Sequence, residues 1–153
     1  METSLQVLTV QVVLQKKGTQ VHSIPQEASI LEAVDKMCSL KVGALLVVQA
    51  NKPVGIISER DLMNRVVLNR KDPASLRVAE VMSSNLFTIT PEEKLSAAMS
   101  LMTEKRIRHL PVVDGSGNLK GMVSIGDLVR TITSAQEEFI NMLEDYITGK
   151  HMA

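Results

Sequence analysis

Aromatic residues are nearly absent from this chain of 153 residues, which has two phenylalanines, one tyrosine and no tryptophan. Binding of single-stranded nucleic acid relies on aromatic side chains that stack on bases, so this mode of binding is nearly excluded. The chain also lacks the basic excess of a nucleic-acid surface, because 17 acidic residues balance its 17 basic ones. No nucleic-acid partner is expected, and a flat ligand would have to be enclosed by aliphatic side chains.

Cysteine and long apolar runs are scarce as well. Cys38 is the single cysteine, which excludes an internal disulfide, and its apolar helical neighbourhood predicts a small buried side chain. No apolar run reaches the ~18 residues of a membrane span, and the N-terminus does not resemble a secretory signal. We therefore expect no membrane partner and predict a cytoplasmic location.

What the chain does have is an internal repeat. Residues 55–62 (GIISERDL) return 66 positions later as residues 121–128 (GMVSIGDL). Each copy predicts a buried strand that ends in serine and turns into a helix, with an aspartate three residues after the serine. Matched segments extend the repeat, so that each copy reads helix, strand, helix, strand, strand, helix. They are residues 9–14, 21–24, 30–37 and 44–48 in the first copy and 77–82, 86–89, 95–102 and 109–113 in the second, with turns at 51–53 and 114–118.

The repeat also predicts the domain organisation. We expect a first repeat with its N-terminal helix (1–76), a second repeat (77–133), and a C-terminal helix and tail (134–153). A unit of about 60 residues buries too little surface alone, so the two copies should pack together. The predicted fold class is α/β (α+β): two repeats face to face through small sheets, helices outside, with pseudo-two-fold symmetry and two related clefts.

The C-terminal segment predicts a further helix. Residues 134–137 (SAQE) match a capping box, which places a separate helix over residues 135–147. Phe139, Ile140, Leu143 and Ile147 line one face of it. We expect this face to dock on the body of the protein or on a partner subunit.

The repeated serine and aspartate admit two interpretations. Ser58 with Asp61, and Ser124 with Asp127, match a helix-capping pattern, in which the serine oxygen accepts a free backbone N–H. The same helix start could also bind a polar ligand, because its N–H groups are unpaired and an aspartate can accept hydrogen bonds from two neighbouring hydroxyls. Both interpretations stay open at this point.

A phosphate beside an aspartate would need nearby cations, and the chain has them. Arg60 precedes Asp61, and Arg106, Arg108 and His109 lie one strand before Ser124. Arginine binds phosphate through short, often bidentate hydrogen bonds. The alternative for Arg106 and Arg108 is a helix end where cations offset the dipole, and His109 could be a half-buried, hydrogen-bonded histidine.

These motifs resemble a CBS-domain pair, also called a Bateman module. Residues 106–113 (RIRHLPVV) followed by 121–124 (GMVS) are typical of the family, and the resemblance covers residues 9–133. Residues 42–48 (VGALLVV) and 58–61 (SERD) are similar to stand-alone two-CBS regulatory proteins. The resemblance implies AMP, ADP, ATP or NAD(H) as ligands, with S-adenosylmethionine ranked below these nucleotides. It also implies a homodimer that forms a disc of four repeats.

The resemblance further implies composite sites, in which the first strand of one copy meets the serine and aspartate of the other. Asp61 and Asp127 would hold the ribose, the two serines would bind near ribose and phosphate, and apolar strand residues would enclose adenine. Site one would use Val21, Ser23, Ile24, Arg108, His109, Met122, Ser124 and Asp127, with Arg106 as a further phosphate contact. Site two would use Thr88, Ile89, Thr90, Gly43, Ala44, Ile56, Ser58, Arg60 and Asp61.

The two sites are not expected to bind alike. The first copy has Gly43-Ala44 where the second has Arg108-His109, so site one should hold phosphate more firmly. The predicted function is a nucleotide-sensing regulatory module that acts on an unknown partner in trans; the alternative is a dimeric interaction scaffold without a regulatory ligand. No nucleophile–base pair, metal-ligand cluster or glycine-rich phosphate loop stands out, so we expect no enzyme activity, no catalytic residue, no catalytic cofactor and no metal.

Overall fold

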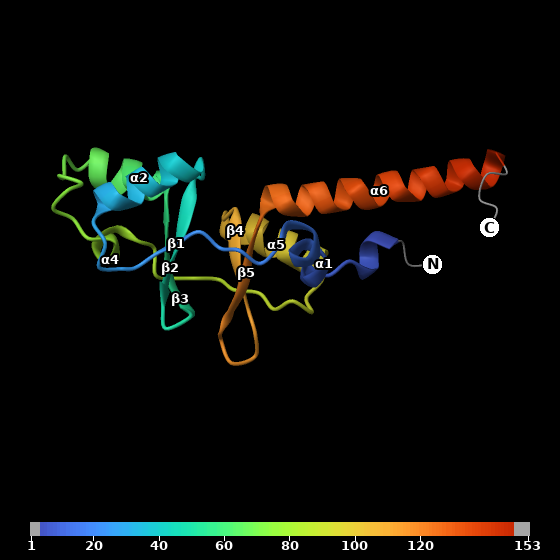
Figure 1. Cartoon of the computed structure of the whole chain (residues 1–153), viewed down its shortest axis with the longest axis horizontal. Coiled ribbons are helices and arrows are strands. Elements are labelled where there is room, and N and C mark those ends of the chain that lie inside the picture. The colour runs from blue at the N-terminus through green and yellow to red at the C-terminus, as the bar shows by residue number, and fades with distance from the viewer. Residues whose placement is uncertain (1–3, 149–153) are drawn as a thin grey trace. The chain divides into compact units, whose positions relative to one another are not determined.

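The computed structural model describes residues 4–148. The chain divides into two compact units, each built from separate stretches of sequence. Unit 1 takes its described residues from Met1–Thr19, Ile89–Val112 and Gly121–Ala153, and unit 2 consists of Gln20–Thr88 and Val113–Lys120. Helices and small sheets are mixed, as predicted for the fold class (Figure 1).

Unit 2 contains a three-stranded sheet in the order β1 (Ser23–Ile24), β2 (Ala44–Gln49), β3 (Lys52–Ser58). β1 runs parallel to β2, and β2 pairs antiparallel with β3. Ala50 and Asn51 connect β2 to β3 with φ angles of 51° and 60°, as in the two-residue turns whose twist suits a hairpin. The observed turn therefore begins one position before the predicted range of residues 51–53, and Lys52 already belongs to β3.

The helices of unit 2 are α2 (Ile30–Leu40), α3 (Glu59–Asp61), the π-helix η2 (Leu62–Val67) and α4 (Val78–Val81). A capping box starts α2: Ser29 Oγ accepts the Glu32 N–H, and the Glu32 carboxylate accepts the Ser29 N–H. Apolar side chains from all three strands, from α2, from η2 and from α4 form one core. Its buried members are Ile24, Ile30, Ala33, Met37, Leu45, Val47, Ile57, Val66, Val78 and Val81.

Unit 1 contains the 3-10 helix η1 (Ser4–Val7), α1 (Val10–Lys17), α5 (Leu95–Lys105) and α6 (Ile125–Thr148). β4 (His109–Val113) and β5 (Leu119–Ser124) form a two-stranded sheet, and the tip of this hairpin, Val113–Lys120, groups with unit 2. The extended segment predicted over residues 86–89 is reduced to a single parallel bridge between Ile89 and Val112.

The first helix of each sequence repeat lies in the unit formed by the other repeat. α1 belongs to unit 1, where the Val10 N–H donates to the Glu93 carbonyl at 2.8 Å. α4 belongs to unit 2, where the Val78 N–H donates to the Ala28 carbonyl at 2.8 Å. The compact units therefore interleave the sequence repeats rather than coincide with them.

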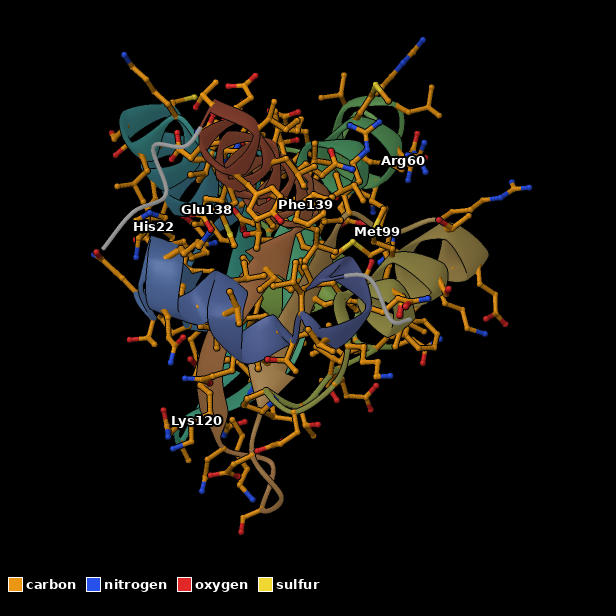
Figure 2. All side chains as sticks on the ribbon, turned by 90° about the vertical axis from the view of Figure 1, so that its right-hand side faces the viewer. His22, Arg60, Met99, Lys120, Glu138 and Phe139 are labelled. Carbon is orange, nitrogen blue, oxygen red and sulfur yellow. The ribbon has the colours of Figure 1, made fainter. Side chains whose placement is uncertain are left out.

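The C-terminal helix differs from the prediction at its start. Residues 135–147 are helical as expected, but α6 runs without interruption from Ile125 to Thr148, so the capping box assigned to residues 134–137 is wrong (Figure 1). The apolar face of its last turns does not dock on unit 1: Phe139 and Ile140 are each 51% exposed, and Ile147 is 80% exposed. In Figure 2 the labelled side chains of Phe139 and Glu138 extend from this helix.

Cys38 corrects a second prediction, because its side chain is exposed rather than buried. Its neighbour Met37 lies in the core, and successive residues on a helix point about 100° apart. Apolar neighbours in the sequence therefore did not indicate which face of α2 the cysteine occupies. No helix among residues 4–148 is long and apolar enough to cross a membrane.

Candidate functional site

Both repeated serine–aspartate pairs form capping boxes. In the first copy, the Ser58 N–H donates to Asp61 Oδ2 at 3.0 Å, and the Asp61 N–H donates to Ser58 Oγ at 3.4 Å. In the second copy, the matching distances for Ser124 and Asp127 are 2.8 Å and 3.2 Å. The capping interpretation is thus confirmed in both copies. Both aspartates are also buried, with 8% and 7% of their surface exposed, which is unusual for a carboxylate that serves only as a cap.

One backbone hydrogen bond in each copy joins the start of the helix to the start of a strand. The Glu59 N–H donates to the Gly43 carbonyl at 3.0 Å, and the Ile125 N–H donates to the Arg108 carbonyl at 2.9 Å. Ala44 is the register partner of Ser58. Gly43 and Ala44 are therefore held beside the Ser58–Asp61 turn, and Arg108 is held in the same way beside the Ser124–Asp127 turn.

The first-copy turn, which we call half-site A (residues 43, 44 and 58–61), is held mainly by neutral groups. Asp61 accepts hydrogen bonds from the hydroxyls of Ser58 and Ser83, each at 3.1 Å. Its only ion pair among the described residues is a long one, with Arg65 Nε at 4.0 Å from Oδ1. The Glu59 carboxylate lies 3.4 Å from where a Cβ on Gly43 would stand, so an acidic group occupies this place.

Arg60 is exposed on α3, where Figure 2 labels it. Glu59 and Asp61 flank it in the chain, so the local charge of half-site A is negative. The role of Arg60 as a phosphate-binding cation of site two stays a prediction.

The second-copy turn, half-site B (residues 108, 109 and 124–127), is held by cations. Lys17 Nζ donates to Asp127 Oδ2 at 2.7 Å and to the Met122 carbonyl at 2.9 Å. Arg130 Nη2 donates to Asp127 Oδ1 at 2.6 Å. Burial acts to raise the pKa of Asp127, but the hydrogen bonds from Lys17 and Ser124 outweigh it and lower the pKa below its usual value of 3.8.

The basic residues predicted around half-site B differ in burial and in their position on the helices and strands. His109 is half-buried at the start of β4, and burial lowers its pKa below 6.5 although the Asp127 carboxylate acts in the opposite direction. The ring is therefore largely neutral at pH 7. Arg106 is the left-handed residue that ends α5, with φ 56° and ψ 45°, which places it at a helix end as the alternative interpretation had it. Arg108 is exposed.

The predicted site residues fall into both units, and each unit brings part of each composite site together. The pairing of one copy's first strand with the other copy's turn stays a prediction. Unit 2 holds Val21, Ser23, Ile24, Gly43, Ala44, Ile56, Ser58, Arg60, Asp61 and Thr88. Unit 1 holds Ile89, Thr90, Arg106, Arg108, His109, Met122, Ser124 and Asp127.

Three polar residues of the two turns were not predicted from the sequence: Ser83 at half-site A, and Lys17 and Arg130 at half-site B. Lys17 ends α1, where a lysine is ordinarily explained by the helix dipole. Arg130 stands three residues after Asp127, a spacing that places the two side chains on one face of a helix. This spacing was the one available signal. Residues 4–148 contain no group of three side chains suited to hold a metal ion.

Comparison with known proteins identifies the family. The profile of the CBS domain matches residues 17–68 and 78–134. The chain belongs to the CBS-domain family. It is 35% identical to the CBS domain-containing protein CBSX3, mitochondrial, of Arabidopsis thaliana, over 97% of this chain and 76% of that protein. The predicted resemblance to stand-alone two-CBS proteins is confirmed.

Two solved structures of CBS proteins are similar over most of the chain. The structure of a putative signal-transduction protein with CBS domains from Burkholderia ambifaria has a TM-score of 0.78 and 37% identity, covering 82% of this chain and 94% of that one. A CBS domain protein from Pyrobaculum aerophilum, solved in complex with AMP, has a TM-score of 0.70 and 27% identity, covering 78% of this chain and 89% of that one.

Proposed function

We propose that this CBS-domain protein is a nucleotide-sensing regulatory module that binds AMP, ADP, ATP or an NAD-type dinucleotide and acts on another chain. One observation carries the proposal. Both copies bury an aspartate at a helix start beside the beginning of a strand, and at half-site B this turn adjoins Arg108 and His109. A buried carboxylate at a helix start can accept two ribose hydroxyls, while the neighbouring Arg108 guanidinium binds phosphate. The AMP complex of the similar protein from P. aerophilum supports this ligand class.

The proposed sites are composite, and they follow the proposed repeats 1–76 and 77–133. Site one combines half-site B with residues 21–24, and site two combines half-site A with residues 88–90. Asp127 and Asp61 hold the two riboses. The proposal further includes regulation in trans, without catalysis and in the cytoplasm.

Thermal unfolding with and without ligand tests the proposal. Wild type, Asp61→Ala and Asp127→Ala are heated with AMP, ADP, ATP, NAD, NADH or S-adenosylmethionine. A ligand at 100 times its Kd stabilises the folded protein by about 2.7 kcal/mol. We expect at least one adenosyl compound to raise the melting temperature of wild type, and at least one aspartate variant to lose that shift. If no compound shifts wild type, the proposed function is wrong. Shifts that survive both substitutions refute the ribose assignment.

A second measurement tests the inequality of the two sites. Arg108→Ala should weaken the binding of AMP and ATP more than that of adenosine, because only the nucleotides carry the phosphate that the guanidinium binds. Gly43→Ala is the matched change in half-site A, and it should not separate the three ligands. Equal losses for adenosine and ATP in Arg108→Ala would contradict a phosphate role.

The exposed apolar face of α6 favours a second candidate function, a dimeric interaction scaffold. Phe139, Ile140, Leu143 and Ile147 are 45–80% exposed, and an apolar face of this kind is expected to be covered by a partner. Sedimentation equilibrium of wild type and of a Phe139→Ser, Leu143→Ser double variant tests it, with Glu138→Ser as the control on the same helix. A wild type that dimerises while the double variant stays monomeric supports a homodimer through α6. A monomeric wild type at micromolar concentration excludes it.

A further inference from the structure

The structure carries a further inference, which rests on the proposed function, about how half-site B is occupied in the absence of ligand. We propose that Lys17 and Arg130 form an exchangeable clamp on Asp127. Without ligand they hold the carboxylate; when a nucleotide binds, they release it to the ribose and bind the phosphates instead. This site therefore selects adenosine ligands that carry several phosphates over adenosine itself.

The first step of the argument is that both oxygens of Asp127 are already occupied. Oδ2 accepts hydrogen bonds from Lys17 Nζ at 2.7 Å and from the Ser124 N–H at 2.8 Å, and Oδ1 accepts from Arg130 Nη2 at 2.6 Å. A carboxylate offers about four acceptor positions, and the Lys17 ammonium, the Ser124 N–H and the Arg130 guanidinium leave about one of them, whereas a pair of ribose hydroxyls needs two. A ribose can bind Asp127 only if at least one of the two cations moves away.

The second step is that the cations can move while the carboxylate stays in place. The Asp127 side chain is 8% exposed and is fixed by the capping box at the start of α6. The side chains of Lys17 and Arg130 are 33% and 73% exposed, so their charged ends can reach water when they leave the carboxylate. Gly126 leaves room for Arg130, since a Cβ there would lie 3.4 Å from Arg130 Nη1.

The third step is the cleft that surrounds the clamp. It has a volume of about 240 Å³ and lies between α1 and α6 within unit 1, with Lys16 and Ser134 on its walls beside the clamp residues. Pockets for whole drug-sized ligands usually measure about 300–1,000 Å³, so this one fits a part of a nucleotide. Once Asp127 binds ribose, Lys17 and Arg130 lose their hydrogen bonds to its carboxylate and line the cleft beside Lys16. Phosphate is the part of a nucleotide that complements three such cations.

Half-site A lacks this device, which is why the inference concerns one site alone. The position that matches Arg130 in the first copy is Asn64, and Asp61 is held by the neutral hydroxyls of Ser58 and Ser83. A ribose would replace one hydroxyl with another at Asp61, with no cation set free. Half-site A should therefore distinguish poorly between adenosine and ATP.

Calorimetric titration of the full chain with adenosine, AMP and ATP tests the clamp through changes of opposite sign. Lys17→Met removes both a competitor for Asp127 and a phosphate ligand. We expect adenosine to bind about threefold to tenfold more tightly, because a larger fraction of the protein has a free carboxylate. ATP should bind about tenfold more weakly, as expected when one charged hydrogen bond is lost. Arg130→Met should likewise strengthen the binding of adenosine and weaken the binding of ATP.

Three controls separate the clamp from general charge effects. Lys16→Met should weaken ATP without strengthening adenosine, because Lys16 lines the cleft but makes no ion pair with Asp127. Lys17→Arg, which keeps the charge, should hold both affinities within about threefold of wild type and guards against a folding defect in Lys17→Met. Lys120→Met removes one charge in unit 2 and should leave both ligands unchanged.

The outcomes distinguish this inference from the proposed function. If wild type binds none of the three compounds, the proposed function itself is wrong. If wild type binds ATP but Lys17→Met leaves adenosine unchanged or weaker, the clamp is refuted while nucleotide sensing stands. If Lys17→Met strengthens adenosine and ATP alike, the cations compete for Asp127 without binding phosphate, and the inference is again overturned.

Discussion

The contact between Lys17 and Asp127 gives a sharp prediction of stability, apart from any ligand. A hydrogen bond to a charged group contributes about 1.5–3 kcal/mol net, and partial exposure of one partner reduces this. The Lys17 side chain is 33% exposed and the Asp127 side chain 8%, at a distance of 2.7 Å between Nζ and Oδ2. We therefore expect a coupling free energy of about 1 kcal/mol between the two side chains.

A double-mutant cycle measures this coupling. Wild type, Lys17→Met, Asp127→Asn and the double variant are unfolded in urea at pH 7, and the free energies of unfolding are compared. The pair Lys120–Asp114, whose side chains are 53% and 32% exposed and whose charged atoms lie 3.8 Å apart, is the matched control and should show additive effects. A coupling below about 0.3 kcal/mol for Lys17 and Asp127, or one no larger than in the control pair, would refute the reasoning.

The pH dependence of this cycle has a defined sign. The pKa of Asp127 is lower in the folded protein than its usual value of 3.8, so its ionised form stabilises the fold above that pH. The stabilisation is lost as the pH falls from 3.8 through the folded pKa. The difference in unfolding free energy between wild type and Asp127→Asn should therefore be constant from pH 7 to about pH 5 and shrink below pH 4. A difference that stays the same at pH 3 would contradict the assignment.

Three further predictions concern packing and titration. Gly55→Ala should destabilise the protein by about 1–3 kcal/mol in urea unfolding, because a Cβ there would lie 2.5 Å from a methionine sulfur, whereas Gly115→Ala, which meets no atom within 4 Å, should leave stability nearly unchanged. Ile57→Ala should cost about 2–5 kcal/mol, since its side chain is fully buried in the core of unit 2, and a loss below about 1 kcal/mol would show that the core relaxes around the cavity. The His109 ring should titrate below pH 6.5 by NMR because burial lowers its pKa. The free energy of unfolding should therefore decrease as the pH falls below 6.5, and His109→Gln should remove that dependence. A titration midpoint at or above 6.5 would contradict the burial argument.

Local patterns predicted most of the helices and strands, because these follow from residues close in the sequence. The apolar spacing of α2 and α5, the buried runs of β2 and β4, and both capping boxes at Ser58 and Ser124 were visible in the repeat itself. The grouping of a strand start with a helix start in each half-site followed from the family resemblance, and the structure joins the two by the same backbone hydrogen bond in both copies.

The contacts of the aspartates could not be predicted in the same way. Lys17 and Asp127 are 110 residues apart, and nothing near Lys17 in the sequence indicates that α1 packs in unit 1. The capping box at residues 134–137 failed for a related reason: the box fits a helix start only if the chain leaves the helix before Ser134, and α6 continues through it. A capping-box motif is compatible with a helix start, but whether a helix begins there depends on the conformation of the residues before it.

The exchange of first helices between the repeats has a consequence for folding during synthesis of the chain. Val10, Val13 and Leu14 of α1 are at most 3% exposed in the finished protein, yet α5 and α6, which complete unit 1, follow about 80 to 110 residues later. At about 5–20 residues per second, roughly 4–22 s pass between the emergence of α1 and that of its partners. During this interval the apolar face of α1 is exposed to solvent on the nascent chain. In a fragment that ends with the first repeat, this face would lack α5 and α6 and would stay exposed.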